Sequence, residues 1–128
     1  MIAGTGIDIV DIKRIEKLIE RYDNQFLSKV FTEAEIALCG AKAVPAIHFS
    51  GRWAAKEAFY KALPVELQQI SNWKSVQILP AEDERHPAVD VLNMKLNELL
   101  KENNINIIHV SISHEQTYCV AMVILERP

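Results

Sequence analysis

Three short stretches of the sequence carry side chains that could act on a charged ligand. The first runs from Gly4 to Asp8, the second from Arg52 to Lys61, and the third ends on His114. Carboxylates bind hard divalent cations, whereas guanidinium and ammonium groups bind phosphate oxygens. These residue types leave an anionic ligand possible, although each stretch alone has simpler interpretations.

The spacing within the second stretch is that of neighbouring groups on a helix. Arg52 and Lys56 are four residues apart, as are Glu57 and Lys61, so each pair lies on one face about one turn apart. A carboxylate and an ammonium are then presented together. The same spacing also describes an exposed Glu-Lys pair that stabilises the helix only slightly. Asp8 alone could equally be a turn or capping residue.

Length and composition exclude several classes of protein. The 128 residues predict a single domain, 1–128, and the formal charge of -3 argues against non-specific nucleic-acid binding. The apolar N-terminus is short and contains Asp8, so it predicts neither a signal peptide nor a membrane span. Cys39 and Cys119 are far apart and are expected to be buried thiols rather than a disulfide or zinc site. The Gly-x-Gly before Asp8 lacks the third glycine of a dinucleotide-binding fingerprint.

Hydrophobic periodicity predicts an α+β fold, with helices mainly in the first half packed on an antiparallel sheet. The first predicted strand is Ile2–Val10. In it, Ile7 and Ile9 alternate with Gly4, Gly6 and Asp8, so we expect the isoleucine face to be packed and the glycine face to be nearly bare backbone. Asp11, the Thr32/Glu35 capping box and Pro45 mark helix starts. The predicted helices are 11–22, 24–30, 32–39, 45–63 and 92–102, and the later strands are 75–79, 88–92, 107–113 and 117–125. The strand 117–125 should be central in the sheet because it is apolar on both faces.

Taken together, the motifs resemble those of the holo-acyl-carrier-protein synthases, members of the 4′-phosphopantetheinyl transferase superfamily. The resemblance extends from Met1 to Glu126, with a poorly matched middle from about Pro64 to Leu100. It rests on Gly-x-Gly-x-Asp-Ile-Val near the N-terminus, Phe-Thr-Glu-Ala-Glu at 31–35, Gly-Arg-Trp-Ala-Ala-Lys-Glu-Ala-Phe-Tyr-Lys-Ala-Leu at 51–63, and Val-Ser-Ile-Ser-His at 110–114. One departure is the segment 64–69, which has no glycine where the family usually has a glycine-rich loop.

The resemblance implies a transfer of 4′-phosphopantetheine from coenzyme A to a serine of an acyl carrier protein in fatty acid biosynthesis, with release of 3′,5′-ADP. It implies that Asp8 and Glu57 hold Mg²⁺, a metal that uses few carboxylates plus substrate phosphates. Lys61 would clamp phosphate or handle the serine proton, which Glu57 or a water on the metal could take instead. Arg52 and His114 would contact phosphate groups of coenzyme A.

The resemblance also implies partners. The helix with Arg14, Lys17 and Arg21 would receive the acidic carrier protein, an assignment compatible with charge steering, although a solvated helix face has the same pattern. A cytoplasmic homotrimer with sites at subunit junctions is implied as well. Two alternatives stay open: a metal-dependent phosphohydrolase using Asp8, Glu57 and Lys61 with water as nucleophile, and a non-catalytic module that binds an acidic partner.

Overall fold

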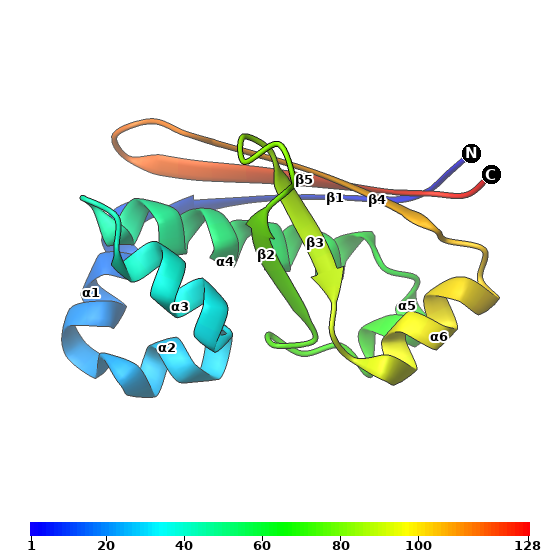
Figure 1. Ribbon diagram of the computed structural model, residues 1–128, viewed down its shortest axis with the longest axis horizontal. Helices are drawn as coiled ribbons and strands as arrows, with labels where there is room; N and C mark the ends of the chain where they lie inside the picture. Colours follow the sequence, from blue (N-terminus) through cyan, green and yellow to red (C-terminus); the bar gives the residue numbers. More distant parts are fainter.

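Strands from both ends of the chain form the main sheet of the protein (Figure 1). The computed structural model describes all of residues 1–128. Its elements, in chain order, are β1 Ile2–Asp11, α1 Ile12–Tyr22, α2 Asn24–Val30, α3 Glu33–Gly40, α4 Pro45–Ala62, α5 Val65–Gln68, β2 Val76–Pro80, β3 Pro87–Val91, α6 Met94–Glu102, β4 Ile107–His114 and β5 Tyr118–Glu126.

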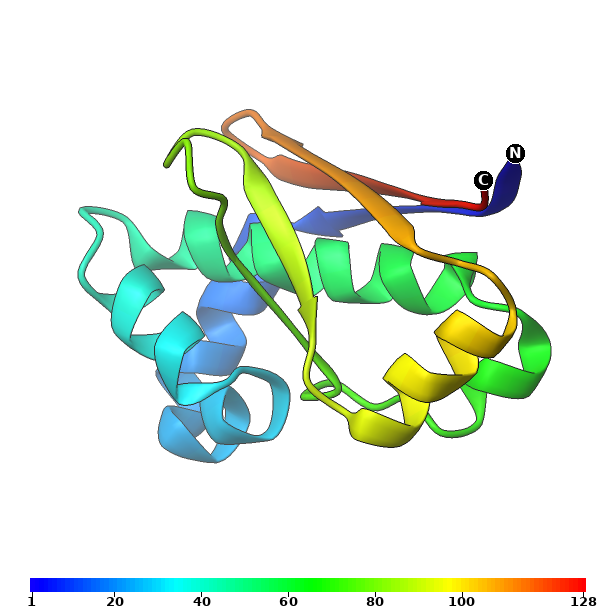
Figure 2. The ribbon, with the colours of Figure 1, turned by 45° about the vertical axis from the view of Figure 1, so that its right-hand side comes forward.

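The long helix α4 lies along one face of this sheet, whose antiparallel order is β1-β5-β4. The predicted α+β class and the central place of the last strand are therefore confirmed. Helices α1 to α3 gather at one end of α4 and helices α5 and α6 at the other, while the β2-β3 hairpin crosses α4 between them (Figures 1 and 2). No helix has the combined length and apolar character needed to cross a membrane.

The local signals at the helix starts are confirmed. Asp11 Oδ1 accepts from the amide of Lys13 at 2.9 Å, and the Thr32 hydroxyl and Glu35 carboxylate form the reciprocal capping box. Pro45 occupies the first turn of α4. The strands β2 and β3 are each displaced by about one residue from their predicted bounds, and the four-residue helix α5 was not predicted. Helix α5 occupies most of the segment 64–69, which lacks glycine, so this part of the chain is a short helix and not a glycine-rich loop.

The prediction of which face of β1 is packed was wrong. Gly4 and Gly6 face α4, and a Cβ built on them would lie 2.1 Å from the Ala62 carbonyl oxygen and 1.9 Å from the Ala58 carbonyl oxygen, respectively. Ile7, on the opposite face, is 63% exposed. The glycines let the backbone of the strand contact the backbone of the helix directly, which no larger residue would permit.

This contact predicts a large effect of a single methyl group. Gly6→Ala should destabilise the fold by about 3 kcal/mol or more, because the added carbon overlaps a backbone oxygen that cannot rotate away. Gly40→Ala is the matched control, since a Cβ there has no heavy atom within 4 Å, and it should be neutral or stabilising by up to about 1 kcal/mol. Chemical denaturation of both variants measures the difference, and an unaltered midpoint for Gly6→Ala would contradict the packing described.

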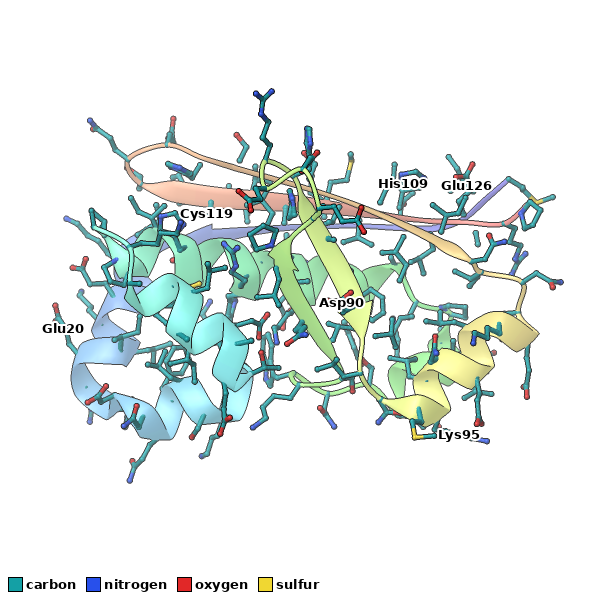
Figure 3. All side chains as sticks on the ribbon, in the orientation of Figure 1. Glu20, Asp90, Lys95, His109, Cys119 and Glu126 are labelled. Atoms are coloured by element: carbon teal, nitrogen blue, oxygen red, sulfur yellow. The ribbon has the colours of Figure 1, made fainter.

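The sheet face that points away from α4 is uncovered, and it is apolar along β1 and β5. Ile7 and Ile9 of β1 are each 63% exposed, and Met122 of β5, which is paired with Ile7, is 44% exposed. The same face carries a 2.9 Å contact between His109 Nε2 and a Glu126 carboxylate oxygen (Figure 3). Strand β5 is thus apolar on both faces, but a single chain covers only one of them.

Candidate active site

Asp8, Glu57 and Lys61 come together where the middle of β1 passes the C-terminal half of α4. Lys61 Nζ donates to Asp8 Oδ1 at 3.0 Å and to the Ile7 carbonyl oxygen at 3.1 Å. Glu57 lies one turn before Lys61 on the same face of α4. The side chain of Lys61 is 49% exposed and that of Asp8 15% exposed, so the group is accessible from solvent. The three residues that the sequence suggested for chemistry are therefore neighbours.

The ionised form of Glu57 is electrostatically disfavoured beside Asp8. Partial burial raises its pKa from the ordinary value of 4.5, and the nearby Asp8 carboxylate raises it further, against smaller opposing effects of Lys61 and Arg14. A partly buried carboxylate beside a second carboxylate fits a divalent cation that uses one or two carboxylates and otherwise substrate phosphates. The structure contains no group of three or more His, Cys, Asp or Glu side chains that could hold a metal by themselves.

The raised pKa of Glu57 predicts how stability depends on pH. A carboxyl with a higher pKa in the folded than in the unfolded chain binds more protons when folded, so the free energy of unfolding falls as pH rises from 4.5 through the folded pKa. Glu57→Gln removes this loss, and its thermal midpoint should exceed that of the wild type at neutral pH. The difference between the two thermal midpoints should disappear below pH 4.5, the ordinary pKa of a glutamate. Equal midpoints for both proteins across this range would contradict the electrostatic description.

Arg14, Lys17 and Arg21 line one exposed face of α1, as predicted. Together with neighbouring side chains they surround a shallow hollow of about 470 Å³. Arg14 differs from the other two because its guanidinium carbon lies 5.6 Å from the centre of the Trp53 ring on α4. Arg14 therefore belongs both to the basic face of α1 and to the surroundings of Glu57.

Lys56, which the helical spacing places on one face with Arg52, carries its charge inside the protein and not at the surface. Its side chain is 1% exposed, and Nζ lies 2.7 Å from Glu35 Oε1. The helical spacing explains the difference, because residues 52 and 56 face β2 and the interior, whereas residues 57 and 61 face β1.

Arg52 and His114 gather elsewhere, around His48 at the start of α4. Partial burial lowers the pKa of His48, and the charges of Arg52, Lys42 and His114 lower it further, in that order. Arg52 Nε also donates to the Ile78 carbonyl oxygen at 3.2 Å. Arg52 and Lys61 are nine positions apart, about 13.5 Å along the helix axis. One chain therefore does not bring Arg52 and His114 to the Asp8 group, and the sequence interpretation missed His48 despite its spacing of four from Arg52.

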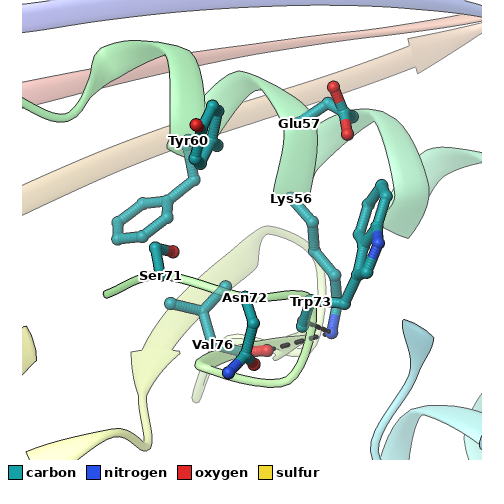
Figure 4. A pocket seen from close by; sticks show the side chains of 8 residues that line it. Lys56, Glu57, Tyr60, Ser71, Asn72, Trp73 and Val76 are labelled. Carbon is teal, nitrogen blue, oxygen red and sulfur yellow. Dashed lines mark hydrogen bonds between the residues drawn. The ribbon is translucent and has the colours of Figure 1, made fainter. Parts of the chain in front are cut away.

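A hollow of about 350 Å³ lies on the other side of Glu57 (Figure 4). Polar groups of Ser71 and Asn72 and the apolar side chains of Phe59, Trp73 and Val76 line it. Phe59 lies within the 51–63 motif, but the other four were not singled out from the sequence, because the segment after α5 has no recognisable motif. The carboxylates of Asp8 and Glu57 and the ammonium of Lys61 therefore lie next to a mainly apolar hollow that also contains polar groups.

The fold agrees with comparisons to known proteins. The sequence model of the 4′-phosphopantetheinyl transferase superfamily matches residues 4–123. The holo-[acyl-carrier-protein] synthase of Syntrophus aciditrophicus is 42% identical over 126 residues, 98% of this chain and 97% of that protein. The crystal structure of the synthase from Neisseria meningitidis superposes with a TM-score of 0.84 at 27% identity, covering 99% of this chain and 100% of that one.

A second crystal structure, the Helicobacter pylori synthase in complex with coenzyme A, has a TM-score of 0.77 at 28% identity over 95% of this chain and 99% of that one. The agreement covers both the helical half and the closing strands, so it spans β1, α4 and β4, which carry the predicted site residues. The chain belongs to the 4′-phosphopantetheinyl transferase superfamily.

Proposed function

We propose that the protein is a holo-[acyl-carrier-protein] synthase, which transfers 4′-phosphopantetheine from coenzyme A to a serine hydroxyl of an acyl carrier protein and releases 3′,5′-ADP. The observation that carries the proposal is the meeting of Asp8, Glu57 and Lys61 in a chain of this superfamily. Coenzyme A in the related Helicobacter pylori structure supports the donor. Fatty acid biosynthesis in the cytoplasm is the setting that the resemblance implies.

Lys61 is suited to hold a phosphate oxygen of the donor. Its ammonium has three N–H donors, of which one binds Asp8 Oδ1 and one binds the Ile7 carbonyl oxygen. The remaining N–H points from an already fixed group toward solvent, where a phosphate can accept it. The serine oxygen then forms a bond to the phosphorus that carries the pantetheine arm, its proton passes to Glu57 or to water, and the bond to the leaving 3′,5′-ADP breaks. Fixed positive charge stabilises the negative charge that develops.

Asp8 and Glu57 would hold Mg²⁺ in this proposal. When bound, the ion supplies positive charge beside the pyrophosphate of coenzyme A. Partial burial and the neighbouring Asp8 carboxylate raise the pKa of Glu57, so a cation that stabilises its ionised form is favoured there. Asp8 also orients Lys61, so the same carboxylate supports both positive groups.

Arg52 and His114 fit the remaining phosphate of coenzyme A if a second copy of the chain supplies them. A homotrimer is supported by the uncovered apolar sheet face of Ile7, Ile9 and Met122, which is unusual for a monomer. Light scattering should give three times the 14.5 kDa of one chain. A fully active monomer at micromolar concentration would exclude a shared site.

The basic face of α1 is the proposed docking site of the acidic carrier protein. Lys17→Glu combined with Arg21→Glu should weaken carrier binding by a factor on the order of 10, because attraction is replaced by repulsion, and should leave coenzyme A affinity unchanged. Arg14 is left intact since it contacts Trp53 beside Glu57. Lys95→Glu with Lys101→Glu, on α6 at the other end of the molecule (Figure 3), is a control of equal charge change. Calorimetry with both ligands decides it, and equal losses for both would mean that α1 is only structural.

The transfer itself is tested by mass spectrometry of an acyl carrier protein incubated with the protein, coenzyme A and Mg²⁺. Addition of the phosphopantetheine mass to the carrier is the expected result. Cleavage of coenzyme A without any carrier would instead support the phosphohydrolase alternative. Binding of the carrier with neither reaction would leave only the non-catalytic module.

A further inference from the structure

The ammonium of Lys56 is the most heavily shared donor inside the protein. Besides the 2.7 Å ion pair with Glu35, it donates to the carbonyl oxygens of Trp73 at 2.7 Å, Val30 at 3.0 Å and Val76 at 3.0 Å. These acceptors come from the end of α2, from the segment before β2 and from β2 itself. A single charged group therefore ties three parts of the chain to α4.

Glu35 completes this network with both of its carboxylate oxygens. Oε1 accepts from the Thr32 amide at 2.9 Å and Oε2 from the Ile78 amide at 2.8 Å. A buried ion pair is not needed for stability as such, since apolar residues of similar size often replace one without loss. What an apolar residue could not replace is the donor for the Trp73 and Val76 carbonyl groups.

Those two carbonyl groups belong to a wall of the hollow beside Glu57. Figure 4 shows Lys56 reaching from α4 to this wall, while Glu57, the next residue, points away from it. The Trp73 ring lies 4.3 Å from the Trp53 ring, measured between centroids. The position of the wall is thus fixed by the hydrogen bonds of Lys56 and by the contact between the Trp53 and Trp73 rings.

We propose that Lys56 is a positioning residue for the transfer reaction: by binding the Trp73 and Val76 carbonyl groups it holds the wall of the hollow that receives the pantetheine arm of coenzyme A. The arm combines methylene groups with amides, which matches the apolar side chains of Phe59, Trp73 and Val76 and the polar groups of Ser71 and Asn72. Lys56 acts through this wall, whereas Glu57 and Lys61 act on the phosphates. The inference rests on the proposed function.

The main test is the double variant Lys56→Met with Glu35→Gln, which removes both charges together and so leaves no buried charge unpaired. We expect it to fold, with the KM for coenzyme A raised on the order of 10-fold and kcat changed less than about 3-fold. Near-ultraviolet circular dichroism of the free protein should also lose the signal of the close, tilted ring pair of Trp53 and Trp73, which are its only tryptophans. Lys74→Met is the control, since Lys74 binds the Ser28 carbonyl oxygen from the same segment but at the surface.

Lys56→Arg separates geometry from charge. Arginine keeps a positive charge for Glu35, but its planar fork cannot converge on several carbonyl oxygens as an ammonium does, so KM should stay high. Restoration of both KM and the tryptophan signal by arginine would overturn the proposal, as would an unchanged KM in the double variant. The tryptophan signal can be measured without substrate. If the wild type transfers no group but the double variant loses this signal, the proposed function is contradicted, whereas the role of Lys56 in fixing the wall is supported.

Discussion

Lys61→Ala is expected to lower the turnover rate of carrier modification by a factor on the order of 10² or more. The reason is geometric: Lys61 Nζ is already held by Asp8 and by the Ile7 carbonyl oxygen, so its free donor is fixed in advance of substrate binding. Stability should change by less than about 1 kcal/mol, since the side chain of Lys61 is half exposed. Turnover and thermal midpoint, measured on the same preparation, separate the two effects.

Lys61→Arg tests which property of the ammonium matters. Arginine keeps the positive charge but does not readily release a proton, so recovery of activity would favour a phosphate clamp. If neither variant is active, the requirement for lysine at this position lies in proton transfer or in its exact placement by Asp8 and the Ile7 carbonyl oxygen. Normal turnover in Lys61→Ala would leave only a surface ion pair.

Asp8→Asn should have the larger effect, with turnover reduced by a factor on the order of 10³, because it removes the charge that fixes Lys61 and half of the carboxylate pair with Glu57. A second result does not depend on activity. If Asp8 and Glu57 hold Mg²⁺, the wild type should gain thermal stability on addition of the ion, and Asp8→Asn should not.

Asp90→Asn is the matched control for this experiment, since Asp90 is an exposed carboxylate on β3 away from the site (Figure 3). It should retain both activity and the response of the thermal midpoint to Mg²⁺. An Asp8→Asn variant that transfers the group at the wild-type rate in the presence of a chelator would remove the metal from the mechanism.

The sequence predicted best what is encoded locally. Asp11, Thr32 with Glu35, and Pro45 each act within one helical turn, and all three mark helix starts in the structure. The pair of Glu57 and Lys61 could be recognised for the same reason, as helical spacing alone puts them on one face.

The errors concern contacts between distant segments. Alternation in β1 revealed two faces, but it could not reveal that the glycine face is the one against α4, since that depends on the helix approaching backbone to backbone. Likewise, the partner of Lys56 is Glu35, 21 residues earlier in the sequence, and nothing in the spacing around Lys56 distinguishes a buried lysine from an exposed one. The wall residues from Ser71 to Val76 become recognisable only when Lys56 joins them to α4.

The contact between β1 and α4 also bears on how far this protein can be altered without loss of activity. The distance between the two elements is set at Gly4 and Gly6 by backbone atoms, which have no rotamers to readjust when residues elsewhere change. Leu96 and Leu100 are buried on α6, which lies on the side of α4 that faces away from β1 (Figures 1 and 2). Mutations there can therefore change the melting temperature over a wide range while the Asp8–Lys61 separation stays constant, which makes α6 the part of the molecule where thermostability can be engineered independently of catalysis.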